Sequence, residues 1–280
     1  MRKKKTRLCF YEPQGRPDPL GFGCASLGFA RGGDTSGAFP LPLEGIHVCG
    51  SYEECLKGAG MVSGLERIKA AIVLLNGQGG ENGFVRRLSS ILKCPVTGGG
   101  AAADAVNEAD AEVLLITDAD YEFEVITENI HSQILGKYRL EPGRCLREVV
   151  RIDGEDAAGW LKRKKGEYGI SEEDFEHLTF SDENHINAHF RQEGDRIFCG
   201  RDIEETMLLR LVEPEEVNRR MQEFYEDEEA VVFGCAGLKG ITTGEIRTRG
   251  LGLFLFGEVC MTADGAEFGN LMLSKLRVRR

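Results

Sequence analysis

The sequence predicts an α+β protein of two related halves, in which helices pack against mostly antiparallel or mixed sheets. A continuous apolar run at 70–76, AAIVLLN, has the length of a buried strand. Glu193-Gly194-Asp195 separates two short strand candidates, and this hairpin spacing argues against a wholly parallel sheet. The 280 residues are 41% hydrophobic, which is enough for the core of one large domain or two ordinary ones.

The first half yields few further elements. The glycine-rich opening 65 residues predict none, whereas 84–92 has the apolar spacing of a helix. A short strand is expected at 94–97, running into three glycines, and another at 112–117. The turn signal Pro142-Gly143 places the boundary near it, between a half of residues 1–140 and a half of residues 141–280.

The second half is patterned more clearly. Asp156 is expected to cap a helix that runs to about 167, and Pro214 to open a second helix. The strand candidates are 147–153, 187–190, 196–199, 206–212, 230–234, 251–256 and 268–278.

Composition excludes several function classes. The formal net charge of -11 disfavours nucleic acid and anionic membranes, so neither partner is expected. The nine cysteines are odd in number and scattered without a CxxC, which predicts free thiols in a reducing cytoplasm. No apolar run reaches the roughly 18 residues of a membrane span, so no membrane insertion is expected.

Three strand ends near the C-terminus carry residues suited to binding. One strand candidate ends in Cys235-Ala236-Gly237, the next is followed by Gly257-Glu258, and the last opens with Asn270 close to its start. Small residues let backbone N–H groups approach a ligand, Glu258 can bind an ammonium, and Asn270 offers a donor and an acceptor. We therefore expect Cys235, Gly257, Glu258 and Asn270 to converge on one pocket.

In order and spacing, these motifs resemble the C-terminal half of the FIST family. The segment from Val149 to Gly154, with Ala157 and Ala158, is similar to that family's strand, Asp-Gly turn and helix. The segment from Cys94 to Asp104 resembles its Pro-Val-x-Gly-Gly-x-Ala stretch. The resemblance covers roughly 70–280, strongly from about 147. The N-terminal half is short for the family, and Leu238 stands where a basic residue usually follows Cys-Ala-Gly.

The resemblance implies a FIST N-like half, a FIST C-like half and an intracellular sensory module for signal transduction. Its ligand would be small, such as an amino acid, and no cofactor is expected. Because no kinase, DNA-binding or methyl-accepting segment is visible, the output would pass through a partner protein or an oligomer. Two other interpretations stay open: an enzyme of unassigned class using Cys235 and Glu258, and a scaffolding protein. The plainer interpretation of Cys235 is a buried core thiol.

Two glycine runs, 77–83 and 98–100, each follow a probable strand. If those strands are neighbours joined by helix 84–92, both runs lie at one edge of a sheet, where Gly98 and Gly99 could face a ligand and Asp104 could hold an ammonium. A dinucleotide fingerprint fails at Asn82, where the third glycine should stand. An anion at the helix N-terminus stays open.

A metal site is also not expected. His185 and His189 have i, i+4 spacing, but their flanks are typical of a loop entering a strand, which would hold them about 13 Å apart.

Overall fold

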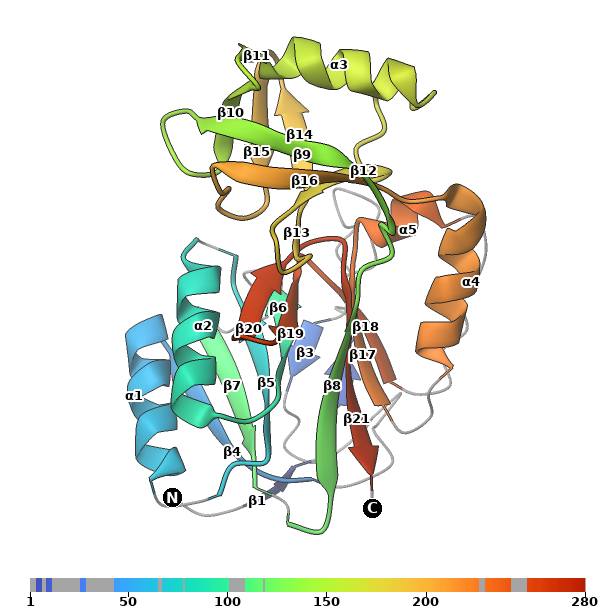
Figure 1. Cartoon of the computed structure of the whole chain (residues 1–280). Coiled ribbons are helices and arrows are strands. Elements are labelled where there is room, and N and C mark those ends of the chain that lie inside the picture. Colours follow the sequence, from blue (N-terminus) through green and yellow to red (C-terminus); the bar gives the residue numbers. More distant parts are fainter. Residues whose placement is uncertain are drawn as a thin grey trace.

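The computed structural model describes residues 4–6, 9–11, 26–28, 43–64, 67–77, 79–100, 109–117, 119–226, 230–242 and 251–279. They form a two-sheet sandwich, with helices on its outer faces, and a second β unit stacked on one end of it (Figure 1). We call the second part, residues 133–211, the cap unit. The predicted α+β class, with antiparallel and mixed sheets and helices packed on them, is confirmed.

One sheet of the sandwich has seven strands in the order β1-β4-β7-β5-β6-β19-β20. Their bounds are β1 Lys4–Thr6, β4 Leu43–Gly50, β5 Ala70–Leu75, β6 Val96–Gly100, β7 Ala111–Ile116, β19 Glu258–Thr262 and β20 Gly265–Gly269. β5 and β6 are parallel, as expected for strands joined by a helix, and the other pairs are antiparallel. A separate two-stranded ribbon joins β2 Cys9–Tyr11 to β3 Ser26–Gly28.

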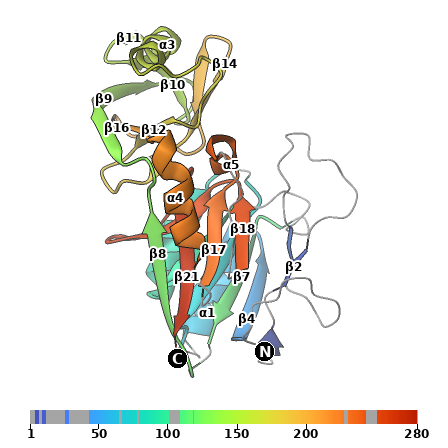
Figure 2. The same cartoon turned by 90° about the vertical axis from the view of Figure 1, so that its right-hand side faces the viewer.

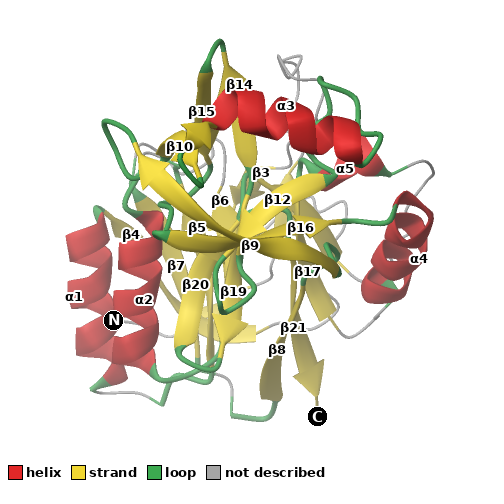
Figure 3. Ribbon diagram, turned by 45° about the horizontal axis from the view of Figure 1, so that its top comes forward, coloured by secondary structure: helices red, strands yellow, loops and turns green. Residues whose placement is uncertain are grey.

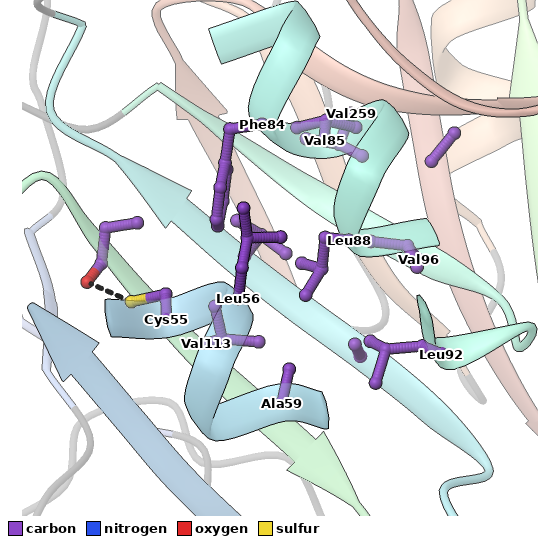
Figure 4. Close-up of a cluster of buried hydrophobic side chains, with 14 of the residues drawn as sticks. Cys55, Leu56, Ala59, Phe84, Val85, Leu88, Leu92, Val96, Val113 and Val259 are labelled. Carbon is purple, nitrogen blue, oxygen red and sulfur yellow. Dashed lines mark hydrogen bonds between the residues drawn. The ribbon is translucent and has the colours of Figure 1, made fainter. Parts of the chain in front are cut away.

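Two helices cover the outer face of this sheet, α1 Tyr52–Ser63 and α2 Glu81–Leu92. Ser51 and Glu54 form a capping box at the start of α1, which satisfies two of its unpaired N–H groups. Apolar residues of both helices meet alternate residues of the strands in one core cluster (Figure 4). Within it, the Cys55 thiol donates to the Ala111 carbonyl at 3.4 Å.

The other sheet has the order β18-β17-β21-β8, with β8 Glu122–Glu128, β17 Ala230–Cys235, β18 Leu251–Leu255 and β21 Leu273–Arg279. Its inner face packs on the seven-stranded sheet through a second cluster that includes Ile72, Phe233 and Leu276. Its outer face is covered by α4 Pro214–Tyr225 (Figure 2). The short helix α5 Leu238–Ile241 follows β17.

The cap unit is an antiparallel sheet in the order β13-β12-β16-β9-β10-β15-β14, with β11 paired to β10. The strands are β9 Gln133–Pro142, β10 Glu148–Ile152, β11 Glu155–Asp156, β12 Leu178–Ser181, β13 Asn187–Ala188, β14 Phe190–Glu193, β15 Arg196–Cys199 and β16 Thr206–Leu211. Helix α3 Ala157–Glu167 lies across it, capped by Asp156 as predicted (Figure 3).

The chain reaches the cap unit through residues 129–132 and leaves it through 212–213. The predicted boundary at 140/141 stays a prediction, and it falls inside β9. Each sandwich sheet combines strands from both sides of that boundary: β19 and β20 join the seven-stranded sheet, whereas β8 joins the four-stranded one. The halves predicted along the sequence are therefore interleaved in space.

Two strand predictions need correction. The single strand expected at 268–278 is two strands, β20 and β21, which belong to different sheets and are separated by a turn at 270–272. Leu271 has a positive φ of 52° in this turn, which breaks the extended backbone. The glycines 98–100 do not follow a strand but form most of β6.

Candidate functional site

The site lies where the sandwich meets the cap unit, at the strand ends that the sequence singled out. Glu258 begins β19 and pairs across the sheet with Gly99 on one side and Gly269 on the other. Gly257, just before it, has a φ of 96°, and its carbonyl oxygen accepts the N–H of Gly100 at 3.0 Å. The structure thus brings the glycines of β6 next to Glu258.

Glu258 is a completely buried carboxyl group. Its Oε2 accepts the backbone N–H of Met272 at 3.1 Å, and its Oε1 has no hydrogen-bond partner among the described residues. Desolvation raises the pKa of Glu258 well above its usual range, which the Met272 N–H and the Cys235 thiol only partly offset. Burial therefore favours the protonated, uncharged form of this carboxyl.

Cys235 lies beside Glu258, at the end of β17. Burial, followed by the neighbouring carboxyl, raises the pKa of its thiol far above the ordinary value. Burial and Glu258 also raise the pKa of Tyr225, which reaches the same cluster from α4. These groups form a neutral cluster, and Cys235 is a thiol instead of the thiolate that a nucleophile requires.

Asn270 sits between the sandwich and the cap unit. A Cβ atom added to Gly257 would lie 2.8 Å from Asn270 Nδ2, and one added to Gly200 would lie 2.3 Å from Asn270 Oδ1. Oδ1 is buried and has no hydrogen-bond partner among the described residues. The side chain therefore contacts glycine backbone on both sides, and its acceptor oxygen is unsatisfied.

Gly98 and Gly99 are held by close backbone packing. A Cβ on Gly98 would lie 1.9 Å from the carbonyl oxygen of Val73, and one on Gly99 would lie 2.1 Å from that of Gly257. Neither position accepts a side chain, because the neighbouring strands leave no space for one. Asp104, the other residue predicted for this edge, lies outside the described residues.

The glycine loop before α2 holds a carboxylate of its own. Gly79 donates its N–H to Glu81 Oε1 at 2.7 Å, and Arg147 donates to Glu81 Oε2 at 2.7 Å. Glu81 is buried at the helix N-terminus, where an external anion would otherwise bind. The carboxylate at this helix end is thus supplied by the chain itself.

Asn187, which the sequence did not single out, connects the site to the cap unit. Its carbonyl accepts the N–H of Asn270 at 3.0 Å, and its Nδ2 donates to the carbonyl of Leu271 at 3.3 Å. Its amide also exchanges hydrogen bonds with Asn129 and contacts His131 Nδ1. Because Asn129 and His131 belong to the segment that enters the cap unit, Asn187 ties that segment to the turn at 270–272.

An ionic chain lies farther along the same junction, and its members other than Arg86 are buried. Arg201 contacts Asp182 at 2.8 Å and Glu267 at 3.4 Å, and Glu267 also pairs with Arg86 at 3.0 Å. Arg86 and Glu267 line a cavity of about 300 Å³ together with Asn184, Asp264 and Ala266. Sequence spacing could not reveal this chain, because its members come from α2, β20 and two cap-unit loops.

The two histidines of the i, i+4 pair have separate environments. His185 has a positive φ of 64°, and its Nδ1 contacts Arg210 at 2.5 Å. His189 is half-buried, and desolvation lowers its pKa to about 4. Among the described residues, no group of histidine, cysteine, aspartate and glutamate side chains is arranged to hold a metal ion. Seven of the cysteines are free thiols in the structure: Cys49, Cys55, Cys94, Cys145, Cys199, Cys235 and Cys260.

Comparison with known proteins adds no identification. No model of a known protein family matches this chain, and no curated protein shows significant sequence similarity to it. In the described part of the chain, no helix combines the length and apolar character that crossing a membrane requires.

Proposed function

We propose that this protein is a sensory module that binds a small ligand at Glu258 and Asn270 and signals through a partner protein or a second copy of itself. The observation that supports it is a pair of buried oxygens, Glu258 Oε1 and Asn270 Oδ1, neither of which has a hydrogen-bond partner among the described residues. Gly257 adjoins both residues, since it precedes Glu258 and a Cβ atom on it would lie 2.8 Å from Asn270 Nδ2. Buried polar atoms are rarely left unpaired, so two around one glycine favour an outside donor.

The position of the site favours a role in sensing. Asn270 contacts Gly257 of the sandwich and Gly200 of the cap unit, and the turn that it begins is bonded to Asn187. A ligand that donates to Asn270 therefore acts on groups of both units at once. Coupling between a binding site and a distant surface requires such differential contacts.

The chemistry of the cluster favours binding over covalent catalysis. Burial holds Cys235 as a neutral thiol and Glu258 as a neutral acid, so this state offers neither a nucleophile nor a charged base. The FIST resemblance points the same way, and it makes amino acids the first compounds to test.

A thermal-shift screen of the full chain over amino acids, small carboxylates and nucleotides tests this function. A class of compounds that binds will raise the Tm of the protein as its concentration increases, because a ligand adds RT ln(1 + [L]/Kd) to the stability of the native state. Asn270→Ala will lose the shift, whereas Gln192→Ala, at an exposed site in the cap unit, will keep it. Turnover of the stabilising compound would indicate an enzyme, and a screen without any shift would contradict the proposal.

A further inference from the structure

Six carboxyl side chains are buried in the described part of the chain, and five of them have a basic partner. The five pairs are Glu81 with Arg147, Glu112 with His47, Glu148 with Arg196, Asp182 with Arg201, and Glu267 with Arg86 and Arg201. Glu258 is the exception, because no basic side chain of the described residues lies within ion-pair distance of it. Burying a carboxyl without a counter-charge is costly, so this difference calls for a cause.

The comparison with Glu267 is the closest that the fold offers. Glu258 and Glu267 lie on the same face of the β19–β20 hairpin, since Cys260 pairs with Glu267 and stands two residues after Glu258. Both are buried. Glu267 receives two arginines and the amide of Asn184, whereas Glu258 accepts one backbone N–H and lies beside the Cys235 thiol. The described residues thus provide cations to Glu267 but none to Glu258 on the same face.

The other titratable groups that face Glu258 provide no positive charge. They are Cys235 from β17, Tyr225 from α4 and Cys260 from β19 itself, and burial raises the pKa of all three. Arg201 is close enough to influence Cys260, but its guanidinium is already held by Asp182 and Glu267. The described residues therefore offer no counter-charge to an ionised Glu258.

We infer that the ligand brings a protonated nitrogen group, a primary ammonium or an amidinium, whose N–H groups donate to Glu258 Oε1 and Asn270 Oδ1. This inference rests on the proposed function and names the ligand's chemical class. Such a group satisfies both unpaired oxygens and supplies the counter-charge, whereas a neutral amide would supply only hydrogen bonds and an anion would supply neither.

Binding then releases a proton. Without ligand, Glu258 holds a proton because its site is desolvated. When the cation enters, the carboxyl O–H bond breaks, the proton leaves to solvent, and an N–H group of the ligand donates to the resulting carboxylate. Binding of the cation and deprotonation of Glu258 are thus linked events.

Three compounds of nearly equal shape and different charge test the ligand class: acetamidinium, acetamide and acetate, at matched ionic strength. The Tm of the full chain, measured by calorimetry, is expected to rise with acetamidinium and not with acetamide or acetate. Glu258→Gln will abolish the rise and keep the fold, because an amide replaces a neutral carboxyl of the same shape. Asp264→Asn, at an exposed residue of the same hairpin, will keep the rise and controls for the loss of one negative charge.

Titration calorimetry at neutral pH, in two buffers of different ionisation enthalpy, counts the protons. About one proton released per acetamidinium bound is expected for the natural chain, and none for Glu258→Gln. Stabilisation by acetamide or acetate without acetamidinium would overturn the ligand class but leave the proposed function standing. An equal rise in Glu258→Gln, or no effect of acetamidinium on the natural chain, would overturn the inference. The thermal-shift screen over amino acids, small carboxylates and nucleotides tests the proposed function separately.

Discussion

Asn187 of the cap unit binds the turn that contains Leu271, because its Nδ2 donates to the Leu271 carbonyl at 3.3 Å. Met272, the next residue, donates its N–H to Glu258 from the same turn. The turn between β20 and β21 is therefore fixed at one end by the cap unit and at the other by the candidate site.

Replacing Asn187 by Ala is expected to loosen this turn. The loss of a buried hydrogen-bonded amide should cost about 1–3 kcal/mol of unfolding free energy, measured by urea denaturation. The amide of Met272 should also exchange with deuterium faster than in the natural chain. Gln192→Ala is the control, since its amide bonds only to an exposed carbonyl and its loss should change stability by less than about 0.5 kcal/mol. Unchanged exchange at Met272 would show that Asn187 does not hold the turn.

Glu258→Gln is expected to be more stable than the natural chain at alkaline pH. The pKa of Glu258 is raised in the folded state, so the unfolded chain loses its proton first as pH increases. The natural chain therefore loses stability as pH rises above the ordinary carboxyl range, and the glutamine variant does not. Urea denaturation of both proteins at acidic and alkaline pH measures the difference. A difference that is the same at both pH values would mean that Glu258 is ionised in the fold.

Acid should destabilise the fold through two desolvated histidines. Desolvation lowers the pKa of His131 to about 3 and that of His189 to about 4, so the unfolded chain takes up protons near pH 6.5 while the folded chain does not. Each histidine is expected to lower the free energy of unfolding by about 2 kcal/mol as the pH falls from neutral to 5. Denaturation across this range measures the loss, and an NMR titration of His131 with a midpoint near pH 6.5 would contradict the cause.

Gly98→Ala is expected to prevent stable folding. Its Cβ would meet the Val73 backbone at 1.9 Å, and the φ of 129° disfavours any side chain. The free energy of unfolding is therefore expected to fall by more than about 4 kcal/mol. Gly83→Ala is the matched control, because nothing lies within 4 Å of a Cβ atom added at that position on α2. Its free energy of unfolding should rise by about 1 kcal/mol. Circular dichroism and thermal unfolding compare the two. A stable, native-like Gly98→Ala would show that β5 and β6 are not packed this closely.

Some elements that the sequence analysis did not predict lack a strong local pattern. β8 and β9 are partly exposed strands that mix charged and apolar residues, so no apolar run marks them. In contrast, residues 268–278 read as one strand because apolar Leu271 and Met272 continue the run through the turn. Only the two different sheets that β20 and β21 join show where that run divides.

The sequence by itself determined the elements whose signals are local: the apolar strand β5, the helix capped by Asp156, the helix opened by Pro214, and the hairpin of β14 and β15. It also placed Glu258 and Asn270 at strand ends. Only the tertiary structure decided which carboxyl groups received counter-charges, because Arg86 and Arg201 reach Glu267 from α2 and the cap unit. Spacing along a chain records local propensity, whereas ion pairing and desolvation depend on neighbours that are distant in sequence.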